Sequence, residues 1–76
     1  MGLIEKLEDK KSFLIQSAAA NNEAKLKAAE CLKIDLEQYN YNPSDAQNWD
    51  LYDKIEIEIN KLNEETIKPL LIAFDF

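Results

Sequence analysis

The stretch that decides the fold is residues 18–24, Ala18-Ala19-Ala20-Asn21-Asn22-Glu23-Ala24. It separates two segments in which apolar residues recur at helical spacing, one over residues 3–20 and one over residues 23–40. The stripe members are Leu3, Ile4, Leu7, Leu14, Ile15 and Ala18 in the first segment, and Ala24, Ala28, Ala29, Leu32, Leu36 and Tyr39 in the second. Asparagine favours turns and helix N-caps, so this junction predicts a helical hairpin.

A single long helix is the alternative. Counted at about 100° per residue through Asn21 and Asn22, the two stripes stay nearly aligned, so one helix about 55 Å long would also keep a continuous apolar face. A lone helix of that length would leave so small a chain with little core, which favours the hairpin. Periodicity alone leaves both possibilities open.

A third helix is predicted over residues 45–65. Ser44 and Gln47 have the spacing of a capping box, and Asp45 would lie in the first turn, where the helix dipole favours an anion. The apolar stripe behind this cap consists of Trp49, Tyr52, Ile55, Ile59 and Leu62. Residues 55–59 also alternate isoleucine with glutamate, a pattern typical of a strand, and this alternative stays open.

The C-terminal residues 68–76 are apolar on all sides, and Pro69 suits either the first turn of a short helix or an extended segment. The sequence therefore predicts one small all-α domain over residues 1–76. We expect it to consist of a helical hairpin, a third helix and a short C-terminal element of uncertain type.

The composition argues against an enzyme, a metal site or a cofactor site. The chain has no histidine and one cysteine, Cys31, so it lacks a nucleophile–histidine pair and a zinc ligand set. It also lacks a glycine-rich phosphate loop, and paired carboxylates such as Asp50 and Asp53 are usually solvated on an exposed helix. A lone cysteine, the absence of a signal-peptide pattern and the absence of a long apolar stretch predict a cytoplasmic protein that does not cross a membrane.

Acidic residues are concentrated in residues 30–65, where ten carboxylates face three lysines, a net charge of −7. The whole chain carries −6, so the first and last parts are close to neutral. A surface of this sign repels nucleic acid, which disfavours direct binding to it. The richness in isoleucine, lysine, asparagine and glutamate is typical of an A+T-rich genome, such as that of a low-GC bacterium or a phage.

Four aromatic residues lie inside the acidic stretch. Aromatic side chains anchor protein interfaces while charges steer the encounter, so this region is a candidate surface for a basic protein partner. The candidate partner-binding residues are Tyr39, Tyr41, Trp49, Asp50, Tyr52, Asp53 and Glu56. The simpler interpretation is that the acids form a solvated helix face and that Tyr39, Trp49 and Tyr52, which lie on the stripes, belong to the core.

Phe13 and Ile57 project away from the stripes of their own helices, and Leu26 and Ile34 also lie off theirs. A middle helix packed on two sides accounts for Leu26 and Ile34 but poorly for Phe13 and Ile57. These two residues are candidates for self-association, including a homodimer.

The function that these patterns favour is a non-enzymatic inhibitor or adaptor that docks on a basic protein. A basic protein that handles nucleic acid is a specific version of this partner. Small acidic phage proteins that inhibit host defences offer an analogy of size and charge. The alternative is a structural helical subunit that assembles through its off-stripe apolar residues.

Overall fold

The computed structural model describes residues 7–45 and 48–74 of the chain. Five helical elements follow one another: α1 (Leu7–Ala20), α2 (Asn22–Leu32), the 3₁₀ helix η1 (Leu36–Tyr39), α3 (Trp49–Asn60) and α4 (Lys68–Ala73). No strand occurs within these described residues. The predicted small all-α, three-helix fold is confirmed, and the C-terminal element is a short helix.

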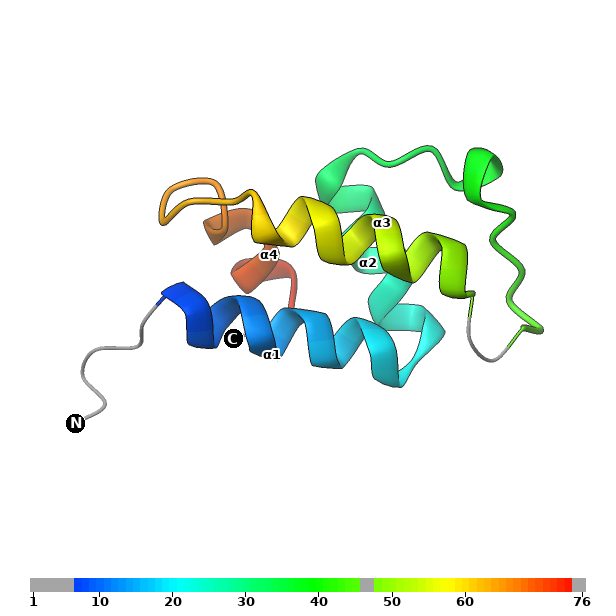
Figure 1. The fold of residues 1–76 in the computed structure, drawn as a ribbon, viewed down its shortest axis with the longest axis horizontal. Coiled ribbons are helices and arrows are strands. Elements are labelled where there is room, and N and C mark those ends of the chain that lie inside the picture. The colour runs from blue at the N-terminus through cyan, green and yellow to red at the C-terminus, as the bar shows by residue number, and fades with distance from the viewer. Residues whose placement is uncertain (1–6, 46–47, 75–76) are drawn as a thin grey trace.

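Helices α1 and α2 share the centre of the packing. Each contacts the other, and both contact α3 and α4. The second helix is therefore packed on more than one side. Figure 1 shows α1 and α3 running lengthwise with α2 behind them, and η1 within the long connection from α2 to α3. The helix η1 contacts α3.

The core is one cluster formed where the helices meet. Alanines on α1 and α2 let these two helices approach closely, and aliphatic side chains of α3 and the C-terminal residues fill the remaining space. Its buried members are Leu14, Ala18, Ala28, Ala29, Leu51, Ile55, Ile59, Ile67 and Leu70. On α3 the buried stripe is thus Leu51, Ile55 and Ile59. Trp49, which the sequence placed on that stripe, is 56% exposed.

Asn21 makes the break between α1 and α2. Its backbone is extended, with φ −156° and ψ 158°, and its side-chain Oδ1 accepts a hydrogen bond from the backbone N–H of Ala24 at 2.7 Å. This is the N-cap arrangement that satisfies a donor of the first helical turn. The hairpin is confirmed, and the single long helix is wrong.

The second helix is shorter than predicted, since it ends at Leu32 instead of continuing to residue 40. Lys33 adopts a left-handed conformation, with φ 59° and ψ 41°. The backbone N–H of Ile34 then donates to the carbonyl oxygen of Ala29 at 2.9 Å, which turns the chain back and lets Ile34 pack against the core. Tyr39 consequently lies in η1.

The predicted start of the third helix is also wrong. Helix α3 begins after Asn48, and Ser44 donates its backbone N–H to Asn42 Oδ1 at 2.9 Å in the preceding loop. Gln47, the other half of the expected capping box, lies outside the described residues. The buried Asn48 fixes this loop, because its side chain accepts from Asn42 N–H at 2.9 Å and donates to the carbonyl oxygens of Asn42 and Asp45.

Helix α3 runs through residues 55–59, so the strand alternative is wrong. It ends at Asn60, before the predicted residue 65, and a side-chain turn follows it. Asn63 Oδ1 accepts from the backbone N–H groups of Glu65 and Thr66 at 2.9 and 2.8 Å. Such an asparagine turn competes with helix continuation. Pro69 then lies in the first turn of α4.

Candidate functional site

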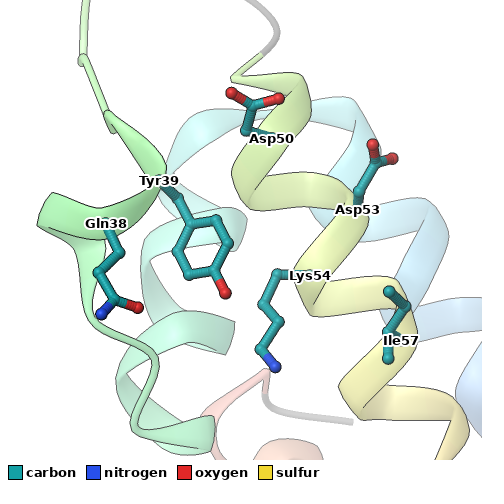
Figure 2. A pocket seen from close by; sticks show the side chains of 6 residues that line it. All are labelled: Gln38, Tyr39, Asp50, Asp53, Lys54 and Ile57. Atoms are coloured by element: carbon teal, nitrogen blue, oxygen red, sulfur yellow. The ribbon is translucent and has the colours of Figure 1, made fainter.

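A concave surface among the described residues lies between η1 and the outer flank of α3, and Tyr39 lines all of it. We call it the Tyr39 trough. Its central hollow has a volume of about 580 Å³ and is shown in Figure 2. The hollow is lined by Gln38, Tyr39, Asp50, Asp53, Lys54 and Ile57.

Two smaller hollows extend the Tyr39 trough at either end, and both share Tyr39 with the central one. The first, of about 210 Å³, adds Trp49, Asn48, Asn40 and Asp45 at the start of α3. The second, of about 330 Å³, is lined mainly by residues of the connection 32–38 and by Lys54 and Glu58. The trough therefore follows α3 from Trp49 to Glu58.

The short helix η1 holds Tyr39 in place. Asp35 Oδ1 accepts from the backbone N–H of Glu37 at 3.0 Å and caps the start of η1. At its end Asn40 is left-handed, with φ 51°, and the backbone N–H of Tyr41 donates to the carbonyl oxygen of Leu36 at 3.3 Å. Tyr39 is half-buried and packs against the core, so its ring is a fixed wall of the trough.

The opposite wall comes from one face of α3. Asp50, Asp53 and Ile57 are spaced at i, i+3 and i+7, which places them in a row along a helix. All three are exposed, and Figure 2 shows the two carboxylates at one end of the row and Ile57 at the other. Within residues 7–45 and 48–74, neither Asp50 nor Asp53 forms an ion pair.

Lys54 also lines the trough, but its charge is compensated. Its Nζ lies 2.9 Å from Glu58 Oε2, and Lys61 Nζ approaches the same oxygen at 3.5 Å. The hydrogen bond with Glu58 raises the pKa of Lys54, and the hydrogen bond from Lys54 lowers the pKa of Glu58. Figure 2 shows the ammonium group directed away from Asp50 and Asp53. The trough is therefore acidic near Trp49 and charge-paired near Glu58.

The aromatic residues of α3 lie beside the trough. The rings of Trp49 and Tyr52 meet edge to face, with centroids 5.8 Å apart and planes at 76°. Burial raises the pKa of the Tyr52 phenol, and the charges of Glu56 and Asp53 raise it further. Trp49 reaches the trough, whereas Tyr52 and Glu56 line none of its three hollows.

The structure thus brings together four of the candidate partner-binding residues, Tyr39, Trp49, Asp50 and Asp53. Tyr41 is half-buried and packs against the core from the loop before α3, and it lines none of these hollows. Sequence reasoning missed Gln38 and Lys54. Lys54 had a signal, since it lies four residues from both Asp50 and Glu58 and so shares a helix flank with them.

The candidate self-association residues, Phe13 and Ile57, are 40% and 52% exposed. They line different hollows. Phe13 contributes to one of about 240 Å³ that also includes Phe74, whereas Ile57 belongs to the Tyr39 trough. The two residues therefore do not share one hollow.

The described residues place no three His, Cys, Asp or Glu side chains where they could hold a metal ion. Within the same part of the chain, each helix is too short or too polar to cross a membrane. Comparison with protein families, curated proteins and solved structures finds no match to this chain.

Proposed function

We propose that this chain is a non-enzymatic protein-binding module, an inhibitor or adaptor that docks its Tyr39 trough on a basic protein. The observation that carries the proposal is the pair of exposed carboxylates, Asp50 and Asp53, beside a fixed tyrosine ring and an exposed tryptophan. Lysine and arginine side chains can interact with both kinds of group. The carboxylates attract their charge, and the aromatic faces contact their aliphatic stems and cationic ends.

The charge of the surrounding chain supports the same partner class. The net −7 of residues 30–65 creates a field that speeds encounter with a basic surface and opposes binding to nucleic acid. A protein that binds nucleic acid carries such a basic surface, so blocking its nucleic-acid site is a specific form of the proposal. Phage-encoded inhibitors of cytoplasmic host proteins belong to this functional class. The single cysteine, which is unpaired, suits a reducing compartment.

The test begins with a partner recovered from host cytosol and measures its association with immobilised chain by surface plasmon resonance. The double substitution Asp50→Asn and Asp53→Asn nearly preserves shape and removes two charges. We expect it to slow association by about threefold to tenfold at low salt, and we expect salt to slow wild-type association in the same way.

The matched control is Glu64→Gln with Glu65→Gln, which removes two charges from the exposed turn after α3. We expect this pair to slow association much less than the Asp50 and Asp53 pair. The trough would not be the docking site if the two double variants slowed association equally. The same would follow if neither salt nor the Asp50 and Asp53 substitutions changed the association rate.

The second candidate function is a structural subunit that assembles with copies of itself. The exposure of Phe13 and Ile57 favours it, since large apolar side chains outside the core are available for contact with another chain. Apolar assembly differs from charge-steered docking in its response to salt, because screening weakens only the latter.

A further inference from the structure

The Tyr39 trough has two chemically distinct ends at a fixed separation. Asp50 and Asp53 form the acidic end, and Ile57 provides an exposed aliphatic surface at the other. At a rise of about 1.5 Å per residue, Ile57 lies about 6 Å along α3 from Asp53 and about 10 Å from Asp50. A ligand that touches both ends must therefore present a cation and an apolar group about 6–8 Å apart.

An extended peptide has this spacing built into its backbone. Its side chains alternate with period two, and residues i and i+2 project from the same face about 6.6 Å apart. A cationic side chain at one position would reach Asp50 and Asp53, and an aliphatic side chain two residues away would rest on Ile57.

The lining also distinguishes an extended segment from a helix. A helix docking in a groove needs a continuous apolar strip for anchors at i, i+3, i+4 and i+7. The central hollow offers two such surfaces, Tyr39 and Ile57, and its other lining residues are polar or charged. From Trp49 to Glu58 the trough follows about 14 Å of α3, the length of about four extended residues.

We propose that the occupant of the Tyr39 trough is a short extended segment of the basic partner, with an arginine over Asp50 and Asp53 and an aliphatic side chain two residues away on Ile57. Arginine suits the acidic end better than lysine, because its planar guanidinium stacks on an aromatic ring and donates to two carboxylates at once. This inference rests on the proposed function and names the recognition element.

The test uses short peptides and the full chain. Two capped heptapeptides, Gly-Ser-Arg-Ser-Leu-Ser-Gly and Gly-Ser-Leu-Ser-Arg-Ser-Gly, carry arginine and leucine two residues apart in the two chain directions. The control, Gly-Ser-Arg-Leu-Ser-Ser-Gly, has the same composition and puts these residues next to each other, on opposite faces. Binding is followed by amide chemical shifts and by the fluorescence of Trp49, the single tryptophan of the chain.

We expect one of the two spaced peptides to bind about tenfold more tightly than the adjacent control, because only a spaced peptide can place its leucine on Ile57 while its arginine meets the carboxylates. Lysine in place of arginine should weaken that peptide. Asp50→Asn with Asp53→Asn should remove the preference for arginine, and Ile57→Ser should remove the preference for spaced leucine. Glu64→Gln with Glu65→Gln should change neither preference. Circular dichroism of each variant checks that the helices are intact.

Equal binding of the spaced and adjacent peptides, or a spacing preference that survives Ile57→Ser, would overturn the inference. Absence of binding by every peptide would also overturn it. If the recovered partner still depended on Asp50 and Asp53 in that case, the proposed function would stand and the partner would use a folded surface. If the partner bound the Asp50 and Asp53 double variant as it binds the wild type, the proposed function would also be wrong.

Discussion

Lys25 is the least expected residue of the molecule. It lies on α2, its side chain is fully buried, and its Nζ has no hydrogen-bond partner among the described residues. The neighbouring Asn22 Oδ1 is likewise buried and without a partner in that part of the chain. Burial lowers the pKa of Lys25, while the charge of Asp45 opposes this effect. A buried ammonium group that forms no hydrogen bond makes the folded state less stable.

Lys25→Met should therefore stabilise the fold. Methionine keeps the length of the apolar stem and removes the charged end, so the free energy of unfolding should rise by about 1–3 kcal/mol. Urea unfolding at neutral pH measures it. Lys27→Met, on an exposed position of the same helix, is the control and should change little. A Lys25→Met variant less stable than wild type would mean that the ammonium group has a stabilising partner.

The same residue gives the wild type a pH dependence with a definite sign. Because the folded pKa of Lys25 lies below its ordinary value of 10.5, the unfolded chain binds more protons between these two values. Stability should then rise with pH across that interval, and Lys25→Met should abolish the rise. Tyr52 has the opposite effect on stability above its ordinary pKa of 10.0. Because its folded pKa is raised, the folded chain binds more protons there, and stability falls as the pH rises.

At the scale of the helices, the features that the sequence predicted correctly have local causes. Asn21 ends one helix and caps the next through a contact three residues away, so its residue type was informative. The start of α3 depends on Asn48, whose side chain bonds across the loop to Asn42, a contact that appears only when the loop has formed. The end of α2 at Lys33 carries no glycine or proline. Its one signal was the off-stripe Ile34, which returns to the core.

Lys33→Gly tests the end of α2 with an effect of known sign. A left-handed residue after a helix is disfavoured for a side chain with Cβ, so glycine there should raise stability by about 1 kcal/mol. Inside a continuous helix the same substitution would lower stability by about as much. Thermal unfolding followed by circular dichroism gives the sign. A destabilised Lys33→Gly variant would mean that α2 continues toward residue 40, as the periodicity alone predicts.

The sequence predicted only part of the candidate site, because local patterns do not show which distant residues come together. Asp50 and Asp53 lie on one face of α3, and local spacing is enough to show it. Tyr39 joins them because the chain leaves α2 at Lys33 and returns along α3 as η1. A helix stripe extended through residue 39 places this tyrosine on the apolar face of a continuous second helix instead. Its position in the trough is a tertiary feature that no local pattern contains.

For the whole molecule, charge and exposed apolar surface act in opposite directions. A net charge of −6 keeps copies apart, while Phe13 and Ile57 offer contact surface to another chain. The self-assembly candidate predicts a dimer or larger species at about 100 μM in sedimentation, more populated at high salt because screening reduces repulsion. Phe13→Glu or Ile57→Lys should then release a monomer that stays helical. A wild-type protein that stays monomeric at low salt and at high salt would exclude self-assembly as the function.

The one-residue junction at Asn21 also has a consequence for how the chain folds. Helices α1 and α2 are neighbours in sequence and in space, so their contacts form with little loss of chain entropy. Bringing α3 onto them requires closing the longer connection of residues 33–48, which is slower and costs more entropy. We expect the α1–α2 hairpin to form early and α3 to dock onto it. The Tyr39 trough exists only once η1 and α3 are side by side, so an incompletely folded chain would have no surface ready to engage a partner.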